Sequence, residues 1–209
     1  MAGLCIAFRL GGARPVGIPI SGIANPKIWL ESECSLVFHC DASGKGIAGF
    51  MAGSPGHLWV ATELPKNITL TWSKSTPTPL VSMDDPESVS SGYCEAAALY
   101  LSLLTFLPIW ADQNPNRPPC TGVWAWSDSQ VVVDMWAKRS ACDTMLPYLR
   151  EYSHLEALYN ITLIISHIDG KLNTTADALS RKQMDKFFRL QPAANRCSLP
   201  LPLGRTLFL

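Results

Sequence analysis

Apolar residues recur along this chain in two patterns, short β-type runs and longer helical runs, from about residue 35 onward. Five segments have the apolar, β-branched or aromatic character of strands: 35–41, 47–52, 57–63 or 68–72, 122–127 and 161–165. A glycine-containing turn separates the first two segments, which predicts a β-hairpin.

Four segments show features of helices: 91–107, 131–138, about 144–159, and one that begins at 173 or 174. The first begins at a serine that can cap a helix, and it is expected to end before Pro108 because proline lacks the backbone N–H that continues a helix. Residues 73–91 are rich in proline and serine and predict a surface loop. The order β-β-β-α-β-α-α-β-α predicts an α/β fold with one sheet.

Length and composition favour a single core, because the chain has 209 residues of which 47% are hydrophobic. We expect residues 1–33 to be a lead-in or the remnant of an upstream connection. Residues 34–185 would form the domain, and the basic, then Pro- and Leu-rich residues 186–209 a loosely ordered tail.

Charge and cysteine content limit the possible functions. Seventeen basic and 17 acidic residues give a net charge of zero, so any nucleic-acid binding must be local. The seven cysteines show neither CxxC nor Cys/His spacing, which argues against a zinc site or a disulfide framework and favours an intracellular location, cytoplasmic or nuclear. No run reaches the ~18–20 apolar residues that a membrane span needs, so no membrane contact is expected.

Four acidic residues occupy positions that suit metal binding. Asp41, Asp128 and Asp177 follow apolar strand or loop segments, and Glu95 lies in the first turn of an apolar helix. A carboxylate that loses hydration there is stabilised by a compensating cation. Four oxygen donors without His or Cys favour Mg²⁺ or Mn²⁺. Two ions about 3.5–4 Å apart would activate a water and stabilise the leaving oxygen during attack on a phosphodiester.

Four stretches carry a resemblance to a known family: residues 38–43 (FHCDAS), 93–97 (YCEAA), 126–132 (WSDSQVV) and 167–181 (HIDGKLNTTADALSR). Together, in the order Asp, Glu, Asp, Asp, they resemble the ribonuclease H domains of retroelement reverse transcriptases, above all those of gypsy-class and DIRS-type elements. The last stretch is the most specific, and the resemblance covers roughly residues 35–182.

The resemblance implies a ribonuclease H-like fold, a five-stranded mixed sheet with helices on both faces. It also implies two Mg²⁺ or Mn²⁺ ions, with Asp41 bridging them, Glu95 and Asp128 completing one site and Asp177 serving the other. The implied enzyme is a metal-dependent endonuclease that cuts the RNA strand of RNA:DNA hybrids as the ribonuclease H part of a retrotransposon polymerase, with an upstream reverse transcriptase domain as a partner. Lys171 stands where many cellular members have histidine, which affects rate rather than reaction type.

Residues beside these motifs are candidate nucleic-acid contacts: Ser43, Ser129, Lys138, Arg139, His167, Lys171, Asn173 and Arg181. The basic ones would contact backbone phosphates. Specificity for RNA would come from 2′-hydroxyl and minor-groove contacts.

Three alternatives remain. An exonuclease of the same superfamily would need Asp-x-Glu on the first strand, where this chain has Asp-Ala-Ser at 41–43. A retroviral-type integrase would place its glutamate after the second aspartate. A catalytically weak or inactive domesticated module that only binds nucleic acid or protein is the third; the unpatterned lead-in and the tail favour it, and the retention of all four carboxylates weighs against it.

Overall fold

The protein was analysed as a computed structural model, which describes residues 29–51, 53, 57–64, 69–71 and 88–202. The chain divides into two compact units, Met1–Leu30 and Glu31–Leu209. All the elements named below lie in the second unit, beginning with a short 3-10 helix at Glu31–Glu33. Most of the expected lead-in, residues 1–28, lies outside the described residues.

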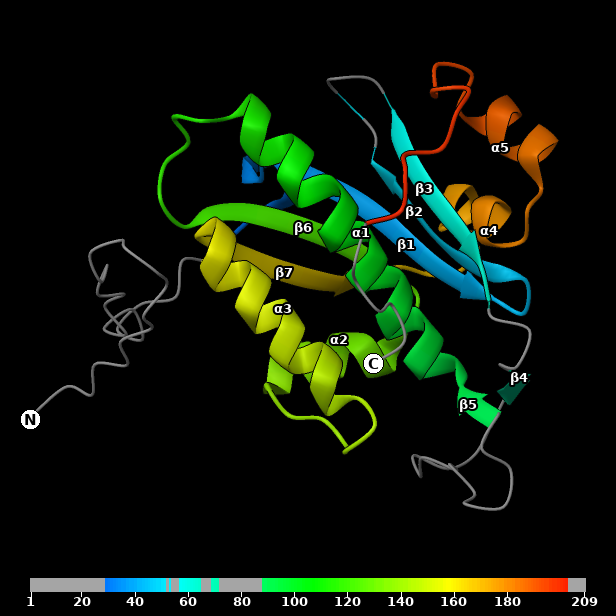
Figure 1. The fold of residues 1–209 in the computed structure, drawn as a ribbon, viewed down its shortest axis with the longest axis horizontal. Coiled ribbons are helices and arrows are strands. Elements are labelled where there is room, and N and C mark those ends of the chain that lie inside the picture. Colours follow the sequence, from blue (N-terminus) through cyan, green and yellow to red (C-terminus); the bar gives the residue numbers. More distant parts are fainter. Residues whose placement is uncertain (1–28, 52, 54–56, 65–68, 72–87, 203–209) are drawn as a thin grey trace, which may run out of the picture. The chain divides into compact units, whose positions relative to one another are not determined.

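One mixed sheet forms the centre of the fold, with the strand order β3-β2-β1-β6-β7 (Figure 1). Its strands are β1 (Leu36–Ser43), β2 (Gly46–Met51), β3 (Leu58–Glu63), β6 (Thr121–Ser127) and β7 (Ile161–His167). β1, β2 and β3 pair antiparallel, whereas β1, β6 and β7 pair parallel. The five-stranded mixed sheet and the α/β class predicted from the sequence are confirmed.

Five helices accompany the sheet: α1 (Ser91–Gln113), α2 (Gln130–Lys138), α3 (Leu146–Tyr159), α4 (Thr174–Ser180) and α5 (Met184–Leu190). Figure 1 shows α1, α2 and α3 on one face, and α4 and α5 beside β2 and β3 on the other. A second, two-stranded parallel sheet pairs β4 (Thr69–Thr71) with β5 (Ser88–Ser90). Most of the expected loop at 73–91 lies outside the described residues.

Side-chain alternation in β2 explains why both faces carry helices. Ile47 and Met51 belong to the main core with α1, whereas Ala48 and Phe50 belong to a second core with α4 and α5. Gly49 faces α1 closely, because a Cβ there would lie 2.1 Å from Ser102 Oγ. The sheet is therefore buried on both sides beside the strand that carries Asp41.

The first helix differs from its predicted length. α1 continues through Pro108 to Gln113 instead of ending at residue 107. Trp110, beyond the proline, is only 4% exposed, and its burial offsets the backbone hydrogen bond that the proline cannot make. By length and composition α1 could span a membrane, but 83% of its most apolar stretch is buried inside the protein, as expected of a core helix.

The expected tail also differs from the structure up to residue 202. Residues 184–190 form α5, and Phe187 of this helix is fully buried against Phe50 and Trp59. The chain then runs along the edge of β3, where Leu199 N–H donates to the Trp59 carbonyl at 2.8 Å. A seven-residue helix is too short to show a clear period, so its aromatic residues were the only signal in the sequence.

Candidate metal centre

Two predicted aspartates lie at the same end of neighbouring parallel strands. His39 of β1 pairs with Trp126 of β6 in the sheet register. Asp41 and Asp128 each follow two residues later, Asp41 inside β1 and Asp128 directly after β6. Parallel pairing therefore brings the two carboxylates together at the carboxyl ends of the central strands, as the sequence predicts.

Glu95 joins this pair from the second turn of α1, not from the first turn as expected, because the helix begins at Ser91. With Asp41 and Asp128 it forms the acidic triad. Each of the three residues offers a carboxylate oxygen that lies within 4.8 Å of the other two. One oxygen of Glu95, Oε1, accepts a hydrogen bond from the Ala42 N–H at 3.1 Å. The other, Oε2, is buried and has no hydrogen-bond partner among the described residues.

Within the described residues, no basic side chain forms an ion pair with the triad. Burial raises the pKa of Asp41 from 3.8 to about 7, and the negative charges of Asp128 and Asp177 add to this effect. Burial, with Asp41 and Asp128 nearby, likewise raises the pKa of the Glu95 carboxyl well above its usual value. The pKa of Asp128 is also raised by burial. Such shifts mean that deprotonating these carboxyl groups destabilises the folded protein unless a cation is bound beside them.

These features fit a divalent cation. The donor set consists of carboxylate oxygens only, which suits hard cations such as Mg²⁺ and Mn²⁺. An unpartnered buried oxygen such as Glu95 Oε2 is the kind of group that a bound ion satisfies. Asp41, Glu95 and Asp128 are the residues that would hold the ion.

Asp177 lies near the triad but is engaged elsewhere. Its carboxylate forms ion pairs with Arg181, one turn further along the chain, and with Lys186 of α5 at 3.4 Å. Even so, it is close enough to raise the pKa of both Asp41 and Asp128. The structure thus brings three of the four predicted carboxylates within ligand distance of one another and holds the fourth beside them in ion pairs.

Two serines that hold α4 against β1 were not assigned this role from the sequence. Ser180 Oγ donates a hydrogen bond to Asp41 Oδ2. Ser43 Oγ, in turn, donates to the Ser180 carbonyl at 2.8 Å. Ser180 lies three residues after Asp177, so it shares a helix face with it, and this spacing was the available signal.

Two residues of the loop between β7 and α4 also shape the centre. Asn173 is 1% exposed and donates from Nδ2 to the Cys40 carbonyl at 2.9 Å, which joins the start of α4 to β1. Gly170 passes so close to Asp128 that a Cβ there would lie 3.1 Å from Oδ2. The absence of a side chain at residue 170 therefore helps the loop to approach Asp128.

The other predicted nucleic-acid contacts occupy varied positions. His167 is exposed and its Nε2 lies 3.2 Å from the Asp128 carbonyl, and the exposed Lys171 follows Gly170 in the same loop. Ser129 precedes α2 without capping it through its side chain. Lys138 pairs with Asp134, and Arg139 covers the Trp136 ring at 3.4 Å. Ser43 and Asn173 are buried, so their side chains serve the protein interior.

Comparison with known proteins gives structural matches alone. No protein-family model and no curated protein matches the chain. LC11 ribonuclease H1 from compost, solved in complex with an RNA/DNA hybrid, has 15% identity and a TM-score of 0.47, and the match covers 72% of this chain and 97% of that one.

Ribonuclease H1 of Halobacterium salinarum NRC-1 has 15% identity and a TM-score of 0.42 over 72% of this chain and 97% of that one. The N-terminal ribonuclease H domain of a Mycobacterium tuberculosis protein has 15% identity and a TM-score of 0.43 over 70% and 96% of the two chains. At this identity the similarity concerns the fold alone. The metal centre rests on the distances and burial described above.

Proposed function

We propose that this protein is a metal-dependent endoribonuclease that cuts the RNA strand of RNA:DNA hybrids. The observation that carries the proposal is the acidic triad, whose carboxylate oxygens lie within 4.8 Å of one another at the ends of two central strands and the start of a core helix. The fold context and the ribonuclease H motifs around each carboxylate support the same reaction.

The chain's own residues would bind and orient the reacting groups. Asp41, Glu95 and Asp128 would hold the divalent cation, and Asp177, beside them, would serve a second one. Bound there, divalent cations supply an activated water and stabilise the charge that develops on the leaving oxygen. The Ala42 N–H fixes one Glu95 oxygen, and Ser180 fixes one Asp41 oxygen, so the triad is oriented before substrate arrives.

The retroelement origin, the partner and the location belong to the same proposal. The stretch HIDGKLNTTADALSR at 167–181 resembles those of gypsy-class and DIRS-type elements, and this resemblance supports assigning the domain to a retrotransposon polymerase with an upstream reverse transcriptase domain as its partner. The six cysteines within the described residues form no disulfide with one another, which is consistent with a reducing, intracellular compartment, cytoplasmic or nuclear.

A cleavage assay tests the reaction. The full chain is incubated with a hybrid that carries end-labelled RNA, in Mg²⁺, in Mn²⁺ or in EDTA. Internal cuts in the RNA strand that require the metal, and that leave 3′-hydroxyl ends, are expected. Single-stranded RNA and double-stranded DNA should stay intact.

Substitutions connect the activity to the triad. Asp128→Asn should abolish cleavage, whereas the matched control Asp134→Asn, on the exposed face of α2, should cut like the unmodified chain. A folded protein that binds hybrid but never cuts it would overturn the nuclease proposal and favour the domesticated binding module. Equal cutting by Asp128→Asn would overturn the role of the triad.

A further inference from the structure

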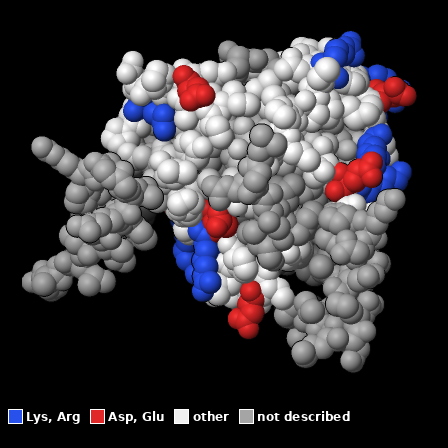
Figure 2. All heavy atoms as spheres, viewed as in Figure 1, with Lys and Arg blue, Asp and Glu red and all other residues white. Residues whose placement is uncertain are grey.

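The basic residues of this chain are concentrated after α4. Residues 181–196 contain five basic side chains and one acidic side chain, a net charge of +4, so the other residues together carry −4. In Figure 2, charged side chains gather at the edge where Figure 1 draws α4 and α5, while the centre of this face carries few. Three of the five basic side chains form ion pairs with acidic residues outside this segment: Arg181 and Lys186 with Asp177, and Lys182 with Glu63. Arg189 and Arg196 add positive charge beyond these pairs, in a chain whose net charge is zero.

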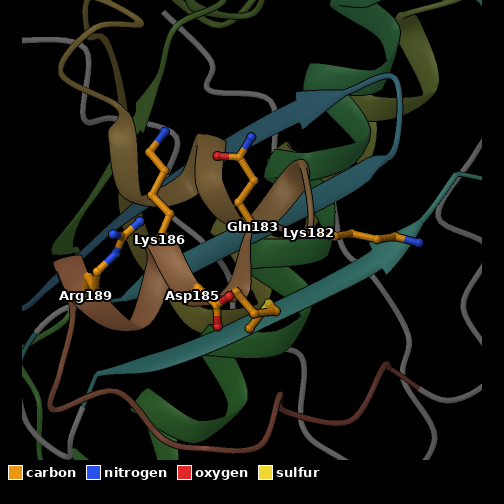
Figure 3. Close-up of a pocket in the computed structure, with 6 residues that line it drawn as sticks. Lys182, Gln183, Asp185, Lys186 and Arg189 are labelled. Atoms are coloured by element: carbon orange, nitrogen blue, oxygen red, sulfur yellow. The ribbon is translucent and has the colours of Figure 1, made fainter.

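A hollow of about 460 Å³ lies over this segment. It is lined by Lys182, Gln183, Met184, Asp185, Lys186 and Arg189. Figure 3 shows that the ends of Gln183, Lys186 and Arg189 lie on one side of α5, while the Asp185 carboxylate lies on the other. Two cations and an amide thus lie on the same side of α5, and the Asp185 carboxylate lies on the opposite side of the helix.

Helix α5, which carries these side chains, is firmly packed against the rest of the protein. Phe187, between them in sequence, is fully buried and contacts Trp59 at a ring separation of 5.5 Å. Arg196 covers the Phe188 ring at 4.8 Å. Because α5 is anchored by these aromatic contacts, Lys186 and Arg189 are presented at a defined spacing of one helical turn.

The hollow adjoins the metal centre. Lys186 Nζ lies 3.4 Å from Asp177 Oδ2, and Asp177 acts electrostatically on Asp41 and Asp128. An ammonium group has three N–H donors, so Lys186 can hold Asp177 and a second oxygen at once. A ligand in the hollow that contacts Lys186 therefore lies close to Asp177.

The lining selects a negatively charged ligand with distributed oxygen acceptors. Arg189 offers planar paired donors and Lys186 a compact positive charge, the combination that binds phosphodiester oxygens. We propose that Gln183, Lys186 and Arg189 form a binding site for a backbone phosphate of the nucleic-acid substrate. The inference rests on the proposed function for the identity of that substrate, an RNA:DNA hybrid.

Binding without cleavage tests the site independently of catalysis. Fluorescence anisotropy of a labelled hybrid is measured in EDTA, over a series of salt concentrations, for the full chain and for Lys186→Gln and Arg189→Gln. Each substitution should raise Kd about 3–10-fold at low salt and reduce the slope of log K against log salt by about one. The control Arg150→Gln removes one charge from an exposed position on α3 and should leave Kd within about twofold.

Hybrids with neutral methylphosphonate linkages in the DNA strand identify the source of the phosphate. If the effect of Arg189→Gln disappears with such hybrids, the phosphate belongs to the DNA strand; if it persists, it belongs to the RNA strand. Either result supports the site.

The inference would be overturned if Lys186→Gln and Arg189→Gln bound the hybrid as tightly as Arg150→Gln does, with unchanged melting temperatures. The hollow would then bind a different anionic partner. Weaker binding by both variants in a protein that never cuts hybrid would support the phosphate site while overturning the nuclease proposal. The two failures are therefore distinguishable.

Discussion

Replacing Asp41 by asparagine is expected to stabilise the metal-free protein at pH 8 and to weaken its binding of divalent cations. Asp41 is only 4% exposed, and its pKa is raised to about 7, first by burial and then by the charges of Asp128 and Asp177. An amide has nearly the shape of a carboxylate and can still accept the hydrogen bond from Ser180. The substitution therefore removes a costly charge without leaving a hole.

The magnitude follows from the pKa shift of Asp41. Its carboxyl has a pKa of about 7 in the folded protein and 3.8 as the reference for the unfolded chain. Between these values the folded protein binds more protons than the unfolded chain, so stability falls as the pH rises and the loss is complete above pH 7. At 1.36 kcal/mol per pKa unit, this group alone lowers the free energy of unfolding by about 3 kcal/mol between pH 5 and pH 8.

Urea denaturation followed by tryptophan fluorescence measures this effect. In EDTA the unmodified chain should lose stability from pH 5 to pH 8, and Asp41→Asn should lose markedly less. Excess Mg²⁺ should restore stability at pH 8 to the unmodified chain far more than to the variant. The control Asp134→Asn, whose carboxylate is exposed and paired with Lys138, should behave like the unmodified chain. An Asp41→Asn protein that is less stable at pH 8 in EDTA would refute the reasoning.

Three further substitutions test the neighbouring features. Glu95→Gln keeps an acceptor for the Ala42 N–H but loses a ligand charge. Its affinity for Mn²⁺ at pH 8, measured by calorimetry, should therefore fall at least about tenfold. An unchanged affinity would exclude Glu95 as a ligand. Ser180→Ala removes the donor to Asp41 and should cost about 1–3 kcal/mol in urea denaturation at pH 8, while no cost would show that the contact is unimportant. Phe187→Ala should cost about 3–5 kcal/mol, measured as a lower melting temperature, whereas a loosely ordered tail would show no change.

The central sheet was predictable because its signals are local. Residues 161–165 (ITLII) are β-branched except for Leu163, and a short turn links β1 to β2, so neither feature needs distant contacts to be recognised. The end of α1 was not predictable in the same way, because a proline inside a helix is tolerated only when residues beyond it, here Trp110, are buried. That burial depends on tertiary packing, which no local pattern records.

The candidate site was also predictable only where its signals are local in the sequence. Asp41 and Asp128 follow from strand ends, and parallel pairing of the two strands then brings them together. The ion pair of Asp177 with Lys186 was not predictable, because it depends on α5, whose seven residues show no clear period in the sequence. The hydrogen bond from Ser180 to Asp41 joins residues 139 positions apart and likewise requires the fold.

The four carboxylates differ in whether basic side chains of the chain form ion pairs with them. This difference argues for a functional rather than a structural role of the triad. In the metal-free protein the charge of Asp177 is balanced by Arg181 and Lys186. The triad has no such partner among the described residues, although Arg181 is close enough to influence the pKa of Asp41 and Asp128. A fold that only needed stability would be better served by apolar residues at these positions. Three converging carboxylates without a cation from the chain therefore favour binding of a cation from solution, and this affinity should exist even without nucleic acid.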